Sequence, residues 1–116
     1  MARLGVNDIM EYCTAVPVPE RHYRELCELF SSIDTSKEAD LLLKDLLTPQ
    51  EMESLAERWQ LVQLLAQGIS QREIAEKLNV SISKVTRGSR VLQYGAGGFM
   101  HFLRKLKKAV SETEKG

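Results

Sequence analysis

The sequence of 116 residues is poor in the residue types that build disulfide frameworks, metal sites and β-sheets. It contains only two cysteines, Cys13 and Cys27, and two histidines, His22 and His101, with no short paired spacing among them. These residues fit neither a disulfide framework nor a metal site, so we expect both cysteines to be reduced, as in cytoplasmic proteins. Aromatic residues make up 6% of the chain and strand-like runs are few, which predicts an all-α fold.

Apolar runs of membrane-spanning length and the usual catalytic patterns are also missing. No run approaches the roughly 20 residues needed to cross a bilayer, and the N-terminus lacks the apolar core of a signal peptide, so we expect a soluble, cytoplasmic protein. No paired-carboxylate, Cys/His or phosphate-loop pattern is present, and Gly95, Gly97 and Gly98 lack the preceding strand of a nucleotide-binding fingerprint. The sequence therefore predicts a protein that is not an enzyme and holds no metal or cofactor.

Negative charge is missing from one long part of the chain, because no acidic residue lies between Glu76 and Glu112. Residues 1–57 contain 5 Lys/Arg and 12 Asp/Glu (net −7), whereas residues 58–116 contain 11 and 4 (net +7), so the formal charge of zero hides two oppositely charged halves. We expect the positive half to attract phosphate groups and the negative half to stay away from nucleic acid.

The positive half contains a stretch, residues 70–92, with the signals of two short helices joined by a tight turn. Ser70 and Glu73 form a capping box, which predicts a helix beginning at the next residue. Asn79 suits the left-handed conformation that ends a helix, and Ser81 can cap a second helix. Two helices linked by about three residues form a helix-turn-helix.

The second helix of this motif is predicted to have an apolar side and a basic side. Helical periodicity places on its inward face Ile82, Val85, Ser89 and Leu92, and on its outward face Ser83, Lys84, Arg87 and Arg90. This is the pattern of a recognition helix, whose N-terminal residues reach base edges while its cations hold phosphates. The alternative is a protein-interaction module with a solvated basic face, and duplex DNA binding with a steep salt dependence would argue against it.

Four further helices are predicted around the motif. The expected ranges are Pro19 to Ile33, about 36–46, about 49–67 and, after a glycine-rich break at 93–98, about 99–110. The residues expected to form the core stripe of the long third range are Met52, Leu55, Ala56, Trp59, Val62, Leu65 and Ala66. The residues expected to be buried by the last helix are Phe99, Phe102, Leu103 and Leu106.

The domain organisation that follows is an N-terminal arm at 1–18 with a short helix near 6–14, one helical domain at 19–111 and a frayed tail at 112–116. The first helices have too little sequence around them to cover their apolar faces, so we hypothesise a homodimer. Gly88 lies inside a predicted helix, where glycine costs about 1 kcal/mol relative to alanine. Either a ligand or a crossing helix is expected to pack closely against it.

Residues 47–92 resemble the tryptophan repressor family. The resemblance rests on Leu-Thr-Pro at 47–49 followed by Glu51, on Ser-Gln-Arg-Glu at 70–73 and on Thr-Arg-Gly-Ser at 86–89, whereas residues 19–46 and 99–110 match in helix count only. It implies a six-helix intertwined homodimer and a transcriptional repressor of palindromic operators. L-tryptophan would act as the corepressor that swings the recognition helix into place.

The resemblance also implies site residues. Arg58 and Arg87 would lie on the two faces of the indole ring, and the amino group would be received by residues of the other subunit. The implied tryptophan-binding residues are Asp45, Leu47, Thr48, Arg58, Val62, Arg87, Gly88 and Val91. The implied DNA-binding residues are Gln71, Arg72, Ile82, Ser83, Lys84, Thr86 and Arg90.

Two features depart from the best-known members of the family. Val91 stands where they have a serine that accepts the indole N–H, and a buried unsatisfied N–H costs about 1–3 kcal/mol. The chain is also one residue shorter between Gly68 and Ser70. Val91 leaves three readings open beside tryptophan binding: a more apolar pocket, a different effector, or DNA binding without an effector.

Overall fold

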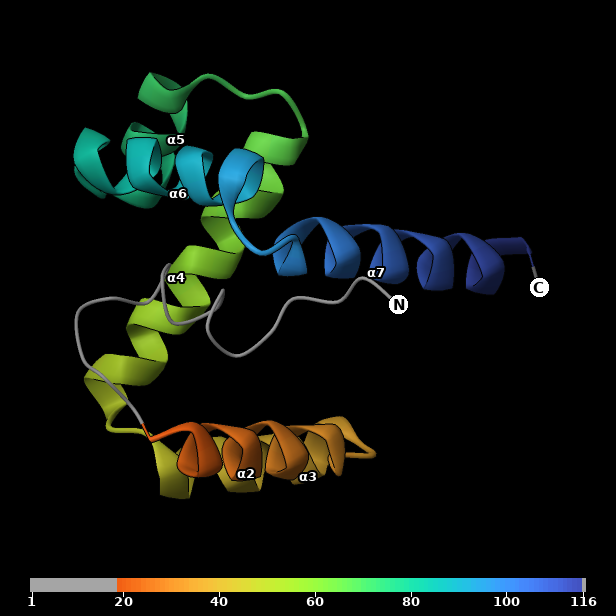
Figure 1. Cartoon of the computed structure of the whole chain (residues 1–116). Coiled ribbons are helices and arrows are strands. Elements are labelled where there is room, and N and C mark those ends of the chain that lie inside the picture. Colours follow the sequence, from red (N-terminus) through yellow and green to blue (C-terminus); the bar gives the residue numbers. More distant parts are fainter. Residues whose placement is uncertain (1–18, 116) are drawn as a thin grey trace. The chain divides into compact units, whose positions relative to one another are not determined.

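The computed structural model describes residues 19–115, with side chains described as far as Lys107. Six helices make up this part of the chain: α2 (Glu20–Ser31), α3 (Ser36–Leu46), α4 (Pro49–Ala66), α5 (Gln71–Leu78), α6 (Ile82–Tyr94) and α7 (Gly98–Lys115) (Figure 1). No strand occurs between residues 19 and 115, so the predicted all-α class is confirmed. The predicted arm, with its short helix near 6–14, lies outside the described residues.

The chain divides within α4 into two compact units, Met1–Ser54 and Leu55–Gly116. The described part of the first unit contains α2, α3 and the first turns of α4. The second unit contains the rest of α4 and all of α5, α6 and α7. The helix-turn-helix therefore lies entirely within the second unit.

In the first unit, local capping sets the ends of the helices. The Glu38 N–H donates to Thr35 Oγ1 (3.1 Å) at the start of α3. At the start of α4, the Glu51 N–H donates to Thr48 Oγ1 (3.1 Å), and the Thr48 N–H donates to Glu51 Oε1 (2.9 Å). Hydrogen bonds to its carboxylate from the Thr48 backbone, and to a lesser extent from the Thr48 side chain, lower the pKa of Glu51, because both favour the charged form. At the start of α4 the two bonds form a capping box, whereas at the start of α3 the Glu38 carboxylate accepts from the Asp34 N–H (2.9 Å) and not from Thr35.

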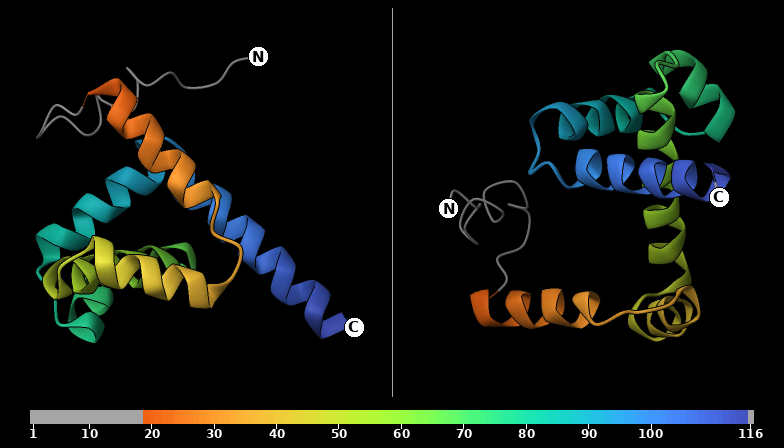
Figure 2. Two further views of the ribbon diagram at one scale, coloured as in Figure 1. Left: turned by 90° about the horizontal axis from the view of Figure 1, so that it is seen from below. Right: turned by 90° about the vertical axis from the view of Figure 1, so that its right-hand side faces the viewer.

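The two helices before α4 bury none of their residues. Figure 2 (left) shows α3 running at an angle to α2. Along α2, Leu29 and Phe30 are 40% and 45% exposed, and along α3, Leu41 is 59% exposed. α2 ends at Ser31, before the predicted Ile33, because the Ser32 hydroxyl donates to the Leu29 carbonyl (2.7 Å) and closes the last turn.

In the second unit, four side chains form a core that joins α4, α5 and α6: Leu61, Val62, Ile74 and Val85. Partly buried apolar residues pack around it, among them Trp59, Leu65, Leu78, Val80 and Phe99. α5 and α6 pack against each other, and Figure 1 shows them together at the C-terminal end of α4. α4 ends at Ala66, close to the predicted end at 67, and the turn after it contains Gly68, whose φ of 85° favours a residue without a side chain.

Several core predictions were wrong. Leu55 is 43% exposed and Ala56 and Ala66 are also exposed, whereas Leu61, which was not in the predicted stripe, is buried. The reason is that α4 is apolar on more than one side, so its pattern alone does not choose the face that α6 covers. Ile82, predicted to face inward, is 51% exposed because it begins α6 beyond the edge of the core.

The last two helices also differ from the prediction. α6 includes Gln93 and Tyr94, and the break begins only at Gly95. α7 runs to Lys115, past the predicted end at Val110 and through residues predicted to fray, because no glycine or proline interrupts it after Gly98. Phe102 and Leu106 are 49% and 48% exposed rather than buried.

Candidate DNA-binding interface

The turn between α5 and α6 has the geometry that the sequence predicted. Ser70 Oγ accepts from the Glu73 N–H (3.2 Å) and caps α5. Asn79 has a φ of 54°, and the next residue, Val80, donates its N–H to the Ala75 carbonyl (3.0 Å). These features form a Schellman motif, which satisfies carbonyls at the end of α5 and reverses the chain. Ser81 Oγ then accepts from the Lys84 N–H (3.3 Å), so α6 begins after only three linking residues.

Two fully buried side chains hold the motif together. Ile74 of α5 and Val85 of α6 are both 0% exposed. Val85 fixes the rotation of α6, because the residues on the opposite side of a helix must then face away from the core. The residues that occupy this outer face at spacings of three or four are Ser83, Thr86, Arg87 and Arg90, and all four are exposed.

A hydrogen bond links the two helices on this outer side. Thr86 Oγ1 lies 2.8 Å from Gln71 Oε1 and 3.0 Å from the Ile82 carbonyl. The hydroxyl carries one proton, so it donates to one of these acceptors at a time. Gln71 and Thr86 are both residues that the family resemblance implies for DNA contact, and the structure brings them together.

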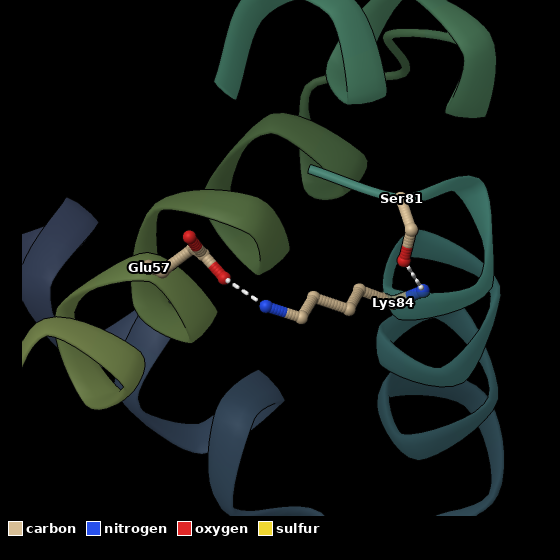
Figure 3. Close-up of polar contacts among 3 residues, drawn as sticks. All are labelled: Glu57, Ser81 and Lys84. Carbon is tan, nitrogen blue, oxygen red and sulfur yellow. Dashed lines mark hydrogen bonds and ion pairs between the residues drawn. The ribbon is translucent and has the colours of Figure 1, made fainter. Parts of the chain in front are cut away.

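The charges of the motif fall into two groups. Lys84 Nζ pairs with Glu57 Oε1 of α4 at 3.2 Å (Figure 3). Arg72, Arg87 and Arg90 are exposed and form no ion pair with any described residue. Three uncompensated guanidinium groups on the outside of a helix-turn-helix can hold phosphates or read guanine edges.

The residues implied for tryptophan binding lie in both units. Asp45 and Thr48 are exposed and Leu47 is half-buried in the first unit. In the second unit Arg58 and Arg87 are exposed, and neither guanidinium makes an ion pair with a described residue.

The other implied residues belong to the contact between α4 and α6 or lie beside it. Val62 is 1% exposed and is part of the core. Gly88 packs against Leu61, so that an added Cβ would overlap Leu61 Cδ2 and lie 3.8 Å from Leu65 Cδ1. Of the two partners left open for Gly88, a ligand or a crossing helix, α4 is thus the one in contact. Val91 is 41% exposed.

Val91 also lines an apolar groove that the sequence did not predict. The groove has a volume of about 510 Å³, and its walls come from α4, α6, α7 and the glycine-rich break. The Trp59 and Phe99 rings stack beside it with centroids 6.2 Å apart. Phe102 and Leu106, which α7 leaves exposed, continue the same lining. The apolar spacing of residues 99–106 is the signal in the sequence that could have indicated the groove, but helical spacing of this kind equally predicts a core face.

No three His, Cys, Asp or Glu side chains of the described residues come together as metal ligands. Within the same part of the chain, no helix combines the length and apolarity needed to cross a membrane.

The capped turn, the shared core of α5 and α6 and the exposed basic face place the chain among helix-turn-helix proteins. Comparison with known proteins then gives the family: the model of the Trp repressor protein family matches residues 21–107. The chain belongs to this family, whose members are DNA-binding transcription regulators and not enzymes.

Individual relatives agree with the family match. A Trp operon repressor homolog of Chlamydia caviae is 36% identical over 105 residues, which cover 90% of this chain and 87% of the relative. One from Mannheimia succiniciproducens is 43% identical over 84 residues, covering 72% of this chain and 79% of the relative. One from Xylella fastidiosa is 39% identical over 87 residues, covering 74% of this chain and 92% of the relative. No solved structure matches the chain significantly.

Proposed function

We propose that this chain is a transcriptional repressor that binds a palindromic operator as a homodimer, with L-tryptophan as its corepressor. The observation that carries the proposal is the helix-turn-helix itself, in which Arg72, Arg87 and Arg90 lie exposed and uncompensated around a rigid α5–α6 pair. The proposed DNA contacts are Gln71, Arg72, Ile82, Ser83, Lys84, Thr86 and Arg90.

The homodimer is supported by apolar residues that a single chain leaves in water. α2 and α3 bury no residue, and α7 presents Phe102 and Leu106 to solvent. Amphipathic helices are stabilised mainly by burial of their apolar faces, and a second copy would provide it. A two-fold dimer also suits two half-sites about 34 Å apart, one turn of duplex DNA. Sedimentation at micromolar concentration tests this, since a folded monomer there would rule the dimer out.

The tryptophan site is supported by the chemistry of Arg58 and Arg87. A guanidinium group stacks on aromatic rings and binds carboxylates through two parallel hydrogen bonds. Arg87 belongs to α6, so a ligand held there would act directly on the recognition helix. The proposed ligand residues remain those implied by the family: Asp45, Leu47, Thr48, Arg58, Val62, Arg87, Gly88 and Val91.

Val91 supports a second version of the function, with a different effector. Its side chain lines an apolar groove and offers no acceptor to an indole N–H. An effector without such a donor would fit this position better. Val91→Ser separates the two versions: it is expected to tighten tryptophan binding about tenfold, from recovery of about 1.4 kcal/mol, if the indole N–H points to residue 91.

Isothermal titration with L-tryptophan is the direct test. We expect saturable heat with the wild type and its loss in Arg87→Ala, with Arg104→Ala on α7 as the matched control that retains binding. Duplex DNA affinity measured with and without tryptophan then shows whether the ligand acts as a corepressor. An absence of heat up to millimolar tryptophan would refute the corepressor role and leave DNA binding as a separate question.

A further inference from the structure

One ion pair in the second unit differs from the others. Glu57 of α4 and Lys84 of α6 are 27 residues apart, and Glu57 Oε1 lies 3.2 Å from Lys84 Nζ (Figure 3). The other ion pairs of the described residues join side chains four positions apart on one helix. The Glu57–Lys84 pair is therefore the one that connects the recognition helix to the core helix.

The pair is held in place from both sides. Glu57 lies one helical turn before Leu61, and Lys84 lies one turn before Gly88, against which Leu61 packs. Leu61 is only 4% exposed, so the contact beside the ion pair is buried. The Lys84 backbone is fixed as well, because its N–H donates to Ser81 Oγ at the start of α6 (3.3 Å, Figure 3). Glu57 and Leu61 on α4 thus lie alongside Lys84 and Gly88 on α6, and this arrangement brings the Glu57 carboxylate and the Lys84 ammonium group together.

The position of the pair bears on DNA binding. Lys84 is in the first turn of α6, where the unpaired backbone N–H groups and the helix dipole already attract phosphate. An unpaired lysine at this position would strengthen the attraction of any duplex, whatever its sequence, because phosphate neutralisation supplies most non-specific affinity. The Glu57 carboxylate opposes both contributions. Since the Lys84 and Glu57 side chains are 62% and 28% exposed, solvent weakens this opposition without removing it.

We infer that Glu57 is a specificity-determining residue: by pairing with Lys84 it keeps this lysine from the phosphates of non-specific DNA. This inference rests on the proposed DNA-binding function. Base contacts made by Ser83 or Thr86 do not depend on the Lys84 charge. Glu57 therefore weakens binding to random sequence, which depends mostly on phosphate contacts.

The salt dependence of binding to a random-sequence duplex tests the inference, because the slope of log K against log salt counts neutralised phosphates. The proteins compared by fluorescence anisotropy are the wild type, Glu57→Gln, Lys84→Gln and the double variant. Glu57→Gln is expected to steepen the slope by about 0.9, the value for one additional phosphate. In the Lys84→Gln background the same change is expected to leave the slope unaltered, because no lysine is released.

Glu53→Gln is the matched control, since Glu53 is exposed on α4 one turn earlier and has no ion-pair partner among the described residues. It is expected to leave the slope unchanged. An unchanged slope in Glu57→Gln would overturn the inference, and so would an equal increase in the Lys84→Gln background or in Glu53→Gln. A wild type that binds no duplex at 50 mM salt, roughly the low end of the range in which such binding is measured, would instead refute the DNA-binding function and the inference with it.

Discussion

The two units of the chain differ in how far they bury their apolar side chains. The unit that contains the helix-turn-helix has its own core, in which Ile74 and Val85 are completely buried. α2 and α3 of the other unit are equally amphipathic in sequence, yet they bury nothing. The core of the helix-turn-helix is thus formed within one chain, whereas the apolar faces of α2 and α3 can be buried only by another surface. Under the proposed function, DNA is contacted by a motif that packs within one chain, and a second copy covers α2, α3 and the exposed apolar residues of α7.

The largest effect is expected from a core truncation in the helix-turn-helix. Ile74→Ala should lower the free energy of unfolding by about 2–5 kcal/mol, because it leaves a cavity between α5 and α6. Urea denaturation followed by circular dichroism measures this. Leu41→Ala in α3, where the side chain is 59% exposed, is the comparison. Equal losses in the two variants at high dilution would contradict the contrast between the units.

Gly88→Ala tests the close contact of α6 with α4. The added methyl group would overlap Leu61, and overpacking typically costs about 1–3 kcal/mol, from which a gain in helix propensity of about 1 kcal/mol is subtracted. We therefore expect a net loss of up to about 2 kcal/mol. Combining it with Leu61→Ala should give a loss smaller than the sum of the two single losses. If the losses in the free energy of unfolding were strictly additive, residue 88 and Leu61 would not be in contact.

The turn between the helices is sensitive to one backbone conformation. Asn79 has a φ of 54°, so Asn79→Ala should destabilise the unit by about 1 kcal/mol. Asn79→Gly should be nearly neutral or stabilising, since glycine adopts this conformation without strain. Thermal unfolding of the pair of variants gives the answer, and a greater loss for glycine than for alanine would count against the Schellman turn.

The smallest effect concerns the start of α4. The hydrogen bonds from Thr48 lower the pKa of Glu51 below its usual 4.5. A lowered pKa in the folded state stabilises the fold above the unfolded-state pKa, and this stabilisation is lost as the pH falls through the lowered value. Glu51→Gln should flatten the Tm profile in that acidic range, whereas Glu53→Gln should not. Identical profiles for the two variants would argue against the capping box.

The sequence predicted the parts of this structure that local signals decide. Ser70 with Glu73 and Thr48 with Glu51 satisfy backbone groups three residues away, so their helix starts follow from short segments. Asn79 likewise marks the turn through its own tolerance of positive φ. The same reasoning located the helix-turn-helix and the basic face of α6.

Contacts between distant segments could not be read in this way. The burial of Leu61, the exposure of Ile82 and the ion pair between Glu57 and Lys84 all depend on how α4 and α6 cross. Phe102 was predicted to be buried because helical spacing identifies an apolar face without saying what covers it. Periodicity predicts which face of each helix is apolar, but the packing of the helices decides which of these faces contact one another.

The central proposal is that the helix-turn-helix of α5 and α6 binds a specific duplex sequence and that tryptophan increases its affinity for that sequence. Selection from a randomised duplex library, carried out with and without L-tryptophan, tests it most directly. The account predicts that a palindromic sequence is enriched, that tryptophan increases its enrichment, and that Arg87→Ala removes the increase. Failure to enrich any sequence in either condition, with a folded protein, would contradict the claim.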